Sequence, residues 1–397
     1  MNVGSERWEI EWDGHMTPAA RVQAAIEILD QVLVGAPAEK ALTGWARRSR
    51  FAGSKDRAAV RDHVFDALRR RNSAAFVGGG LTGRGLMIGV LRQDQADLDA
   101  VFTGEGYAPA ALSADEQSVP VGDPPLDVPD WLETPMRDSL GAAFEDNVAA
   151  LRGRAPVILR VNLRKATVAQ AQELLAEDGI ETLTMALVDT ALEVTEGARR
   201  IKNNAAYLDG LVELQDASSQ ASVAALSFSK GMKVLDYCAG GGGKTLAMAG
   251  RAEAQFFAHD ALEHRMTDLP ARAKRAGVKV QVVKTPKDKA PYDLVLCDVP
   301  CSGSGTWRRT PDAKWRFRPE DLAELERVQA EILEQSKELV ASDGALVYAT
   351  CSVLTAENTA QIEQFVQNNP SWEIDWQRQF LLSEGGDGFF GAILRKI

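Results

Sequence analysis

The sequence has little of three features that often decide a protein's class: cysteine, long apolar runs and excess positive charge. Four cysteines in 397 residues are too few for a disulfide-stapled secreted scaffold. No segment approaches the roughly 18 consecutive apolar residues of a membrane span. The N-terminal stretch has no apolar core, so we expect no signal peptide and a cytoplasmic location without a membrane partner. The net charge of -11 argues against a uniformly basic nucleic-acid coat.

The average charge conceals a strong segregation along the chain. Residues 40–92 carry 12 basic and 3 acidic side chains, whereas residues 93–150 carry 1 basic and 13 acidic ones. Residues 151–165 hold five basic side chains and no acidic one, and residues 271–290 hold seven and one. Such blocks are often only solvated faces, but in a net acidic protein they are compatible with a localised site for a polyanion.

The first 75 residues predict a small all-α domain. Thr17 before Pro18 has the form of a helix N-cap followed by proline at the first helical position. Apolar residues then recur at helical spacing, and further helices are expected over 38–48 and from Ser54 onward. The segment 76–129 is rich in Gly, Pro and Asp, which predicts loops and a linker with few helical turns, and residues 131–151 have a helical pattern. We therefore interpret residues 76–150 as a linker with connecting helices.

The remaining chain predicts two units of mixed α and β structure. Residues 151–212 contain a strand-like segment at 156–163 and a helix-like one at 167–177, which indicates a small α+β subdomain. Residues 213–397 predict an α/β domain, because five short apolar segments alternate with helical patterns. The strand candidates are 233–236, 255–259, 279–284, 293–297 and 345–349, and the clearest helix is 321–340. A parallel sheet of this kind binds ligands at the carboxyl ends of its strands.

A glycine-rich loop follows the first of these strands. Asp236 precedes Tyr-Cys-Ala, four glycines and Lys244-Thr245, an arrangement that brings backbone close to a ligand at a helix N-terminus. A P-loop would need glycine where Cys238 stands, although Asp298 can still mimic the acidic strand end of a nucleotidase. A dinucleotide fingerprint fits only loosely. An S-adenosylmethionine pocket also accounts for Asp260, an acid at the next strand end that suits ribose hydroxyls, although a helix N-cap is an equal reading of this residue alone.

Two cysteines stand at the ends of neighbouring predicted strands. Cys301 lies in Asp-Val-Pro-Cys-Ser-Gly and Cys351 in Thr-Cys-Ser. Neighbouring strand ends are about 5 Å apart, so both thiols can reach one pocket. Cys297 lies inside a strand and is expected to be an inert core residue. We expect no metal site, because there is no C-x-x-C pair and the histidines near the sheet are poorly placed as partners.

A thiol beside a methyl donor suits the methylation of cytosine at C5. Carbon C5 is a poor nucleophile until a thiolate adds at C6 and makes it enamine-like. The activated C5 then attacks an electrophilic methyl group, a base removes the C5 proton, and the thiol leaves by elimination. Such chemistry needs an activated thiolate, an acid that holds the N3 and amino edge of the base, and a base flipped out of its stack.

Together these residues resemble the RNA cytosine-5 methyltransferases of the RsmB/Fmu/Sun group, which are related to the NSun enzymes. The resemblance covers roughly residues 151–397. It implies a Rossmann-like S-adenosylmethionine-dependent methyltransferase sheet with an RRM-like α+β subdomain, and the N-terminal helices resemble a NusB-type RNA-binding domain. The motifs that carry it are Arg160–Asn162, Gln215–Ser219, Asp236–Thr245, Asp298–Gly303, Arg308–Trp315, Tyr348–Ser352, Glu357-Asn358 and Asp387–Phe390.

The resemblance implies a role for each matching residue. Cys351 would be the nucleophile, Cys301 would assist product release, and Asp298 would hold the cytosine edge. S-adenosylmethionine would be the cofactor and RNA, most simply 16S ribosomal RNA, the partner. The implied cofactor residues are Cys238, Ala239, Gly240, Gly241, Gly242, Gly243, Lys244, Asp260, Thr285 and Asp298. The implied RNA-binding residues are Arg160, Asn162, Arg308, Arg309 and Lys314.

The sequence departs from the family pattern at two places. The family usually has alanine and proline where Gly240 and Gly241 stand, which predicts a looser loop and weaker cofactor binding. It usually has Gly-Asp where Lys284 and Thr285 stand. These departures leave room for a catalytically silent RNA-binding or assembly factor on the same fold. Transfer RNA is an alternative substrate, and a DNA-type mechanism with Cys301 as the attacking thiol is an alternative chemistry.

Overall fold

The computed structural model describes residues 16–397, which divide into two compact units. The helical unit contains the described residues up to Val128 together with Thr310–Trp315, and the catalytic unit contains Pro129–Arg309 and Arg316–Ile397. The N-terminal stretch on which the signal-peptide prediction rests lies outside the described residues.

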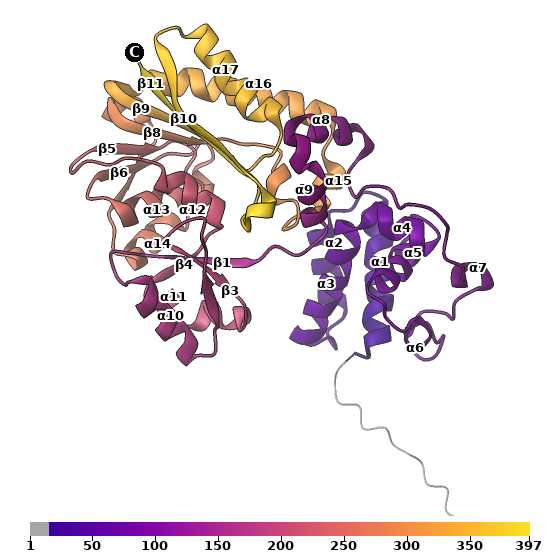
Figure 1. The fold of residues 1–397 in the computed structure, drawn as a ribbon. Coiled ribbons are helices and arrows are strands. Elements are labelled where there is room, and N and C mark those ends of the chain that lie inside the picture. Colours follow the sequence, from indigo (N-terminus) through magenta and orange to yellow (C-terminus); the bar gives the residue numbers. More distant parts are fainter. Residues whose placement is uncertain (1–15) are drawn as a thin grey trace, which may run out of the picture. The chain divides into compact units, whose positions relative to one another are not determined.

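The helical unit is built from helices that share one apolar core (Figure 1). In α1 the Thr17 side chain accepts a hydrogen bond from the Ala20 N–H at 3.1 Å, which confirms the predicted N-cap. The core residues include Ile28, Leu29, Val60 and Leu86. The helices are α1 (Pro18–Leu33), α2 (Ala38–Arg48), α3 (Ser54–Arg69), α4 (Arg71–Gly78), α5 (Gly83–Gln93), α6 (Leu98–Val101) and α7 (Ala114–Gln117).

The loop prediction for residues 76–129 is wrong where α5 lies. Its glycines serve helix packing: a Cβ on Gly89 would lie 1.9 Å from the Ala74 carbonyl oxygen, and one on Gly78 would lie 1.8 Å from the Gly85 carbonyl oxygen. Only glycine permits this close approach of α4 and α5. Because α5 belongs to the helical core, the helical unit extends to Val128 and does not end at residue 75.

The search for membrane-spanning helices in residues 16–397 found no single helix with the required length and apolar character. Helices α4 and α5 satisfy the length and composition test only as a pair, and the pair is bent by 93°. Both helices contribute residues to the apolar core of the helical unit, among them Ala74 and Met87.

The catalytic unit begins with helices α8 (Asp130–Leu140) and α9 (Phe144–Leu151) and continues into a small antiparallel sheet. The strand order is β2 (Thr182–Thr184), β3 (Ala191–Val194), β1 (Val157–Val161) and β4 (Val212–Leu214). Helices α10 (Val168–Glu177) and α11 (Ala205–Leu208) cover the face that carries Leu159 and Leu192. This is the small α+β subdomain that the sequence predicts.

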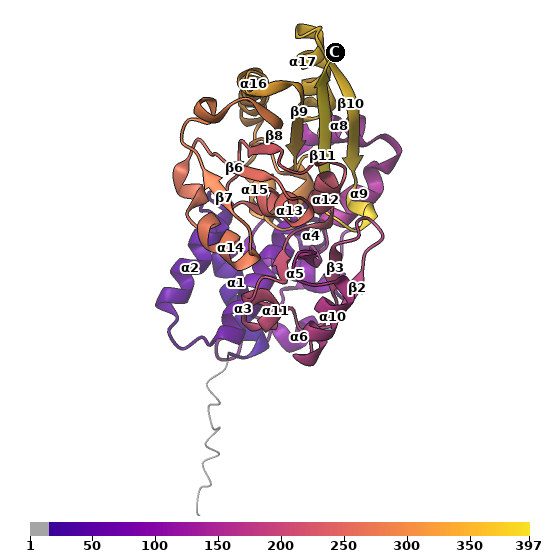
Figure 2. The same ribbon diagram turned by 90° about the vertical axis from the view of Figure 1, so that its left-hand side faces the viewer.

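A seven-stranded sheet forms the centre of the catalytic unit. Its order is β10-β11-β9-β8-β5-β6-β7, so β10 and β7 stand at opposite edges (Figure 2). The pairings from β7 to β9 are parallel, and β11 is antiparallel to both of its neighbours. The bounds are β5 (Lys233–Asp236), β6 (Gln255–Ala258), β7 (Val280–Val282), β8 (Tyr292–Asp298), β9 (Val340–Thr350), β10 (Trp372–Phe380) and β11 (Phe389–Lys396). The five predicted strand positions are therefore confirmed.

Helices cover both faces of this sheet, as a parallel sheet requires. Residues of α12 (Ala217–Ala224) and α13 (Gly243–Arg251) pack on the face that carries Val234 and Leu294, and α14 (Leu269–Ala276) packs beside α13. Helices α16 (Pro319–Lys337) and α17 (Thr359–Asn368) pack on the face that carries Leu235 and Val295. The chain leaves the β7 edge and returns beside β5 as β8, so the topological switch point lies between β5 and β8.

Candidate active site

Four chemically active side chains meet at the carboxyl ends of β5, β8 and β9, beside the switch point. Asp298 ends β8, Cys301 follows it, and Cys351 follows β9. Lys244 reaches the same place from the first turn of α13, where its Nζ lies 2.6 Å from Asp298 Oδ2. Parallel pairing of β8 with β5 and β9 brings these strand ends together, as the sequence predicts.

The two thiols of this site are in contact. Cys301 Sγ and Cys351 Sγ are 3.3 Å apart, and the Gly305 N–H donates to the Cys351 carbonyl oxygen at 3.0 Å. The hydrogen bond from Cys301 lowers the pKa of the Cys351 thiol, although burial opposes this shift. The same pairing and burial raise the pKa of Cys301 well above its ordinary value. Cys351 is therefore the thiol that ionises first, which suits it to be the nucleophile.

Selective alkylation of Cys351 is the expected result of this asymmetry. At pH 8 iodoacetamide should modify Cys351 first, because burial raises the pKa of Cys297 to about 12 and raises that of Cys238 well above its usual range. The rate should rise with pH through a midpoint that lies below that of an ordinary thiol, since the pKa of Cys351 is lowered. Peptide mass spectrometry over a pH series measures this. Faster modification of Cys301 would contradict the assignment.

A buried carboxylate joins the two cysteine loops. Glu357 accepts the Ser302 N–H at 2.7 Å and the hydroxyls of Ser302 and Ser352, each at 2.5 Å. These serines directly follow the two cysteines. Gln329 on α16 donates a further hydrogen bond to Glu357 at 3.1 Å. The carboxylate thus fixes both loops at one point, a role that the sequence analysis missed although Glu357 was among the matching motifs.

Replacement of Glu357 by glutamine should loosen both loops at once. The carboxylate accepts these hydrogen bonds on two oxygens, whereas the neutral amide has only one acceptor oxygen. A buried donor therefore loses its partner, which lowers the free energy of unfolding by about 1–3 kcal/mol. Methyl transfer should also slow, because the spacing of the thiols changes. Urea unfolding and single-turnover kinetics measure the two effects. The exposed Glu363→Gln is the matched control and should change neither.

Lys244 and Asp298 form a largely buried ion pair. Burial disfavours the ammonium group, but the adjacent Asp298 carboxylate outweighs this and raises the pKa of Lys244. The ammonium also lies 4.8 Å from the centre of the Phe389 ring, a cation–π contact. Lys244 therefore stays charged beside the thiols, where its field contributes to lowering the pKa of Cys351.

The other two cysteines lie apart from this thiol pair. Cys297 is fully buried in the core of the sheet and donates to Ser336 Oγ at 3.2 Å, which confirms the prediction of a core residue. Cys238 is half-buried in the glycine loop after β5. Among residues 16–397, no group of three or more His, Cys, Asp and Glu side chains has an arrangement that could hold a metal ion.

The glycine loop has the geometry of a cofactor cradle. Gly240 and Gly242 have φ angles of 50° and 80°, in the left-handed region that favours glycine. The Gly240 N–H donates to Asp260 Oδ2 at 2.9 Å, so Asp260 shapes this loop. At the end of β5 the buried Asp236 Oδ1 has no hydrogen-bond partner, while Oδ2 accepts from Thr245 at 2.6 Å. An orphaned acceptor in this position fits a ligand that brings a donor, such as the ammonium of an amino-acid moiety.

Asp260 and Thr285 differ in their surroundings. Asp260 is 3% exposed and already accepts hydrogen bonds from the Gly240 and Leu262 N–H groups, with Arg265 at 3.3 Å. Its role toward a ribose remains a prediction. Thr285 is exposed between β7 and a short 3-10 helix over Pro286–Lys289. Neither Ala239 nor the four glycines present a side chain beyond a methyl group, so any contact from them is made by the backbone.

The structure corrects the expected RNA contacts of Arg160 and Asn162. Both side chains are buried, at 6% and 8% exposure. Arg160 donates to Gln215 and to the Gly243 carbonyl oxygen, and Asn162 donates to the carbonyl oxygens of Gly210 and Ala276. These residues hold the small sheet, the glycine loop and α14 together, which leaves their polar groups facing protein rather than RNA.

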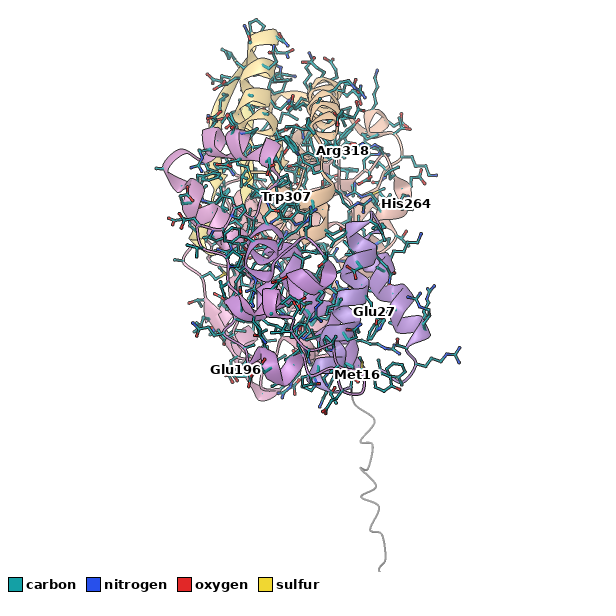
Figure 3. All side chains as sticks on the ribbon, turned by 90° about the vertical axis from the view of Figure 1, so that its right-hand side faces the viewer. Met16, Glu27, Glu196, His264, Trp307 and Arg318 are labelled. Atoms are coloured by element: carbon teal, nitrogen blue, oxygen red, sulfur yellow. The ribbon has the colours of Figure 1, made fainter. Side chains whose placement is uncertain are left out.

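The same correction applies to Arg308 and Lys314 in the motif that follows Cys301. Arg308 is 5% exposed and donates to Asp387 at 2.9 Å. Arg309 donates to Asp387 and Asp216 but is exposed, so its contact with RNA stays a prediction. Trp307, which is labelled in Figure 3, is buried and donates from Nε1 to the Ser302 carbonyl oxygen at 3.1 Å. In the helical unit, Lys314 is buried and donates to the carbonyl oxygens of Arg69 and Asp127. The polar groups of Arg308 and Lys314 therefore bind other parts of the protein.

Comparisons with known proteins agree with this geometry. Residues 223–389 match the family model described as 16S rRNA methyltransferase RsmB/F, and residues 128–199 match the ferredoxin-like domain of RsmF/B-like methyltransferases. The chain is 34% identical over 330 residues to the ribosomal RNA small subunit methyltransferase B of Citrobacter koseri, which covers 79% of this chain and 73% of that relative.

Two solved structures share the fold. The crystal structure of PH0851 aligns with a TM-score of 0.74 at 23% identity and covers 96% of this chain and 99% of its own. The structure of NSun6 from Pyrococcus horikoshii with SFG aligns with a TM-score of 0.60 at 17% identity and covers 68% of this chain and 98% of its own. The segment that matches the RsmB/F model contains Lys244, Asp298 and both contacting cysteines.

Proposed function

The chain belongs to the family of ribosomal RNA small subunit methyltransferase B, and we propose that it methylates C5 of a cytosine in 16S ribosomal RNA through a covalent bond between Cys351 and C6. The family makes it an RNA methyltransferase. The observation that carries the finer proposal is the contact of two thiols, 3.3 Å apart, beside a lysine–aspartate pair at the switch point of the sheet.

Cys351 is proposed as the attacking thiol because its pKa is the lowered one of the pair. The thiolate adds to C6 of the flipped cytosine, and the electron pair of the C5–C6 double bond becomes available at C5. After C5 has gained its methyl group, a solvent water takes the C5 proton, the electron pair of the C5–H bond re-forms the double bond, and the sulfur of Cys351 leaves C6 with the electron pair of the C6–S bond. In the proposal, Cys301 assists this release: its pKa is raised, so it is the protonated partner beside the leaving sulfur.

Asp298 is proposed to hold the N3 and amino edge of the cytosine. Its side chain is one-third exposed, whereas that of Lys244 is one-tenth exposed, so the aspartate faces the accessible side of the pair. A carboxylate oxygen that accepts from the exocyclic amino group fixes the ring over Cys351. Lys244 balances the aspartate's charge and favours the thiolate, so that both the base and its nucleophile are held before reaction.

S-adenosylmethionine is the proposed cofactor, and it would supply an electrophilic methyl group. The support is the family, the SFG-containing structure of NSun6, and a glycine loop in which the buried Asp236 Oδ1 lacks a donor. Residues 238–244 would contact the methionine and ribose side through their backbone, and Asp260 would position the loop and the ribose. In this proposal, the residues that would hold the cofactor lie at the switch point between β5 and β8, where Asp298 also stands.

Bisulfite mapping of ribosomal and transfer RNA, with and without the gene for this protein, tests the proposed function. We expect one or more cytosines in 16S ribosomal RNA to lose protection from conversion when the protein is absent. Protection that is lost only in transfer RNA would overturn the ribosomal substrate. If no cytosine changes and calorimetry detects no binding of S-adenosylmethionine at millimolar concentration, the protein is a silent RNA-binding or assembly factor.

A further inference from the structure

The glycine loop has a backbone that is flexible by composition. Four consecutive glycines, Gly240 to Gly243, connect β5 to α13, and glycine loses more backbone freedom on ordering than any other residue. A loop of this kind left to itself would hold its N–H groups poorly toward a ligand. The cofactor affinity of this loop therefore depends on what fixes its backbone.

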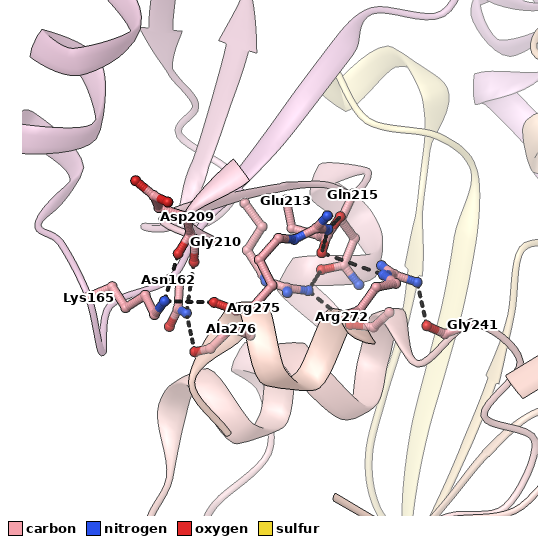
Figure 4. A network of polar contacts seen from close by, with 12 residues as sticks. Asn162, Lys165, Asp209, Gly210, Glu213, Gln215, Gly241, Arg272, Arg275 and Ala276 are labelled. Atoms are coloured by element: carbon pink, nitrogen blue, oxygen red, sulfur yellow. Dashed lines mark hydrogen bonds and ion pairs between the residues drawn. The ribbon is translucent and has the colours of Figure 1, made fainter. Parts of the chain in front are cut away.

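Two arginines fix it by donating to its carbonyl oxygens. Arg160 on β1 donates to the Gly243 carbonyl oxygen at 2.8 Å, and Arg272 on α14 donates to the Gly241 carbonyl oxygen. Figure 4 shows the Arg272 contact reaching from α14 to the loop. The two donors come from segments that lie 112 residues apart in the chain (272 − 160). Hydrogen bonds from the small sheet and from α14 thus hold the loop.

One carboxylate holds Arg272 and its neighbour Arg275. Glu213 on β4 stands directly opposite Arg160 in the register of β1 and β4. It accepts from Arg275 at 2.8 Å and 3.0 Å and from the Arg272 Nε at 3.5 Å (Figure 4). The Glu213 side chain is only 11% exposed, so these interactions are little screened by solvent. The guanidinium groups of Arg160, Arg272 and Arg275 carry more positive charge than Glu213 neutralises. The excess positive charge faces the carbonyl oxygens of the loop.

Gly241 leaves room for this contact. A Cβ on Gly241 would lie 2.9 Å from Arg272 Nη1, which is closer than such atoms normally approach. A side chain at position 241 and the Arg272 guanidinium therefore compete for the same space. At position 241 the chain therefore has a flexible glycine whose backbone is restricted by the hydrogen bond from Arg272. A side chain at this position would instead restrict the backbone directly.

We infer that Arg272, together with Arg160, is a positioning residue for the cofactor loop, and that its hydrogen bond to Gly241 supplies the order that the glycines lack. The inference rests on the proposed function in one respect, namely that the loop binds S-adenosylmethionine. It connects cofactor binding to the small α+β subdomain, because Glu213 and Arg160 belong to that sheet.

Calorimetric titration of the full-length protein with S-adenosylmethionine tests the inference. Arg272→Ala should weaken binding by about tenfold, the scale of losing one hydrogen bond from a charged donor. The matched control is Arg275→Ala, which removes a neighbour on the same helix with the same Glu213 partner but no contact to the loop. It should lower the melting temperature at least as much as Arg272→Ala and change the dissociation constant less than about twofold.

Steady-state kinetics adds a readout that a purely structural role would not move. Arg272→Ala should raise KM for S-adenosylmethionine while kcat at saturation and KM for RNA stay near wild type. Equal binding by Arg272→Ala and wild type would overturn the inference and leave the proposed function intact. Absence of binding by the wild type would instead contradict the proposed function.

The competition for space gives a second test, because the expected effect of Gly241→Ala on cofactor binding reverses when Arg272 is absent. Gly241→Ala in the wild type should weaken cofactor binding by about two- to threefold, because the new methyl group displaces the Arg272 guanidinium. The same substitution in the Arg272→Ala background should strengthen binding, since alanine then restricts the loop without a clash. If the effects of the two substitutions on the free energy of cofactor binding are additive, the inference is overturned. Additivity would mean that positions 241 and 272 act on the loop independently.

Discussion

Methyl transfer should disappear in Cys351→Ala, whereas Cys301→Ala should leave RNA covalently attached to the protein. Removal of a nucleophile costs on the order of 10⁴–10⁶-fold in rate, so Cys351→Ala should show no product in a single-turnover assay. In Cys301→Ala the thiolate of Cys351 is still present to add to C6, but the protonated thiol 3.3 Å away is missing when the sulfur must leave. The adduct should then survive denaturing electrophoresis.

The pair of variants also decides between two chemistries. Both replacements remove one half-buried thiol from the same contact, so each is the structural control for the other. Cys297→Ala is a further control, because that thiol lies in the core and touches neither cysteine loop in the contacts described above. If Cys301→Ala abolishes the adduct and Cys351→Ala retains it, the attacking thiol is Cys301 and the mechanism is of the DNA-methyltransferase type.

Asp298→Asn should reduce the rate of methyl transfer by on the order of 10²–10³-fold, the scale of removing one preorganised contact to a developing charge. The asparagine keeps the shape of the side chain but loses its charge. Two effects combine in this loss: the acceptor for the cytosine amino group becomes a neutral amide oxygen instead of a charged carboxylate oxygen, and the Lys244 ammonium is left buried without its anionic partner at 2.6 Å. Single-turnover kinetics at saturating RNA and cofactor measures the sum.

The double variant Lys244→Met with Asp298→Asn separates these two effects. It removes both charges, so no unpaired ammonium remains in the site. If the double variant regains stability but stays slower than Lys244→Met alone, the aspartate acts on the substrate as proposed. If it is as fast as Lys244→Met alone, the loss in Asp298→Asn came only from the unpaired lysine, and Asp298 does not hold the base.

The catalytic fold was predictable because its signal is local. Strands of the parallel sheet are buried on both faces, so they appear as short apolar runs, and all five expected runs coincide with β5, β6, β7, β8 and β9. Helix α5 was missed for the opposite reason. The glycines of this segment were interpreted as loop formers, but the lack of a side chain on Gly89 permits the close contact with Ala74 of α4, which depends on residues elsewhere in the chain.

The residues of the candidate site also divide into those that local sequence predicts and those that depend on distant partners. The contacting cysteines and the lysine–aspartate pair follow strand or loop motifs, so they were predictable from position alone. Glu357 and Arg272 were not assigned these roles, because a positioning residue is defined by its partners. The RNA-binding prediction was wrong for the buried Arg160, Arg308 and Lys314 for a related reason: a sequence shows that Arg308 is charged but not that Asp387 neutralises it in the interior.

The composition of the helical unit has a consequence for biosynthesis. Lys314 donates to the Asp127 carbonyl oxygen across 187 positions of the chain, and Trp315 donates to the Leu68 carbonyl oxygen at 2.6 Å. A ribosome releases residues in order, so the N-terminal helices emerge long before these two side chains exist. The unit therefore becomes complete only when most of the catalytic sheet has also been made. A fragment that stops at Val128 would lack part of its own interior.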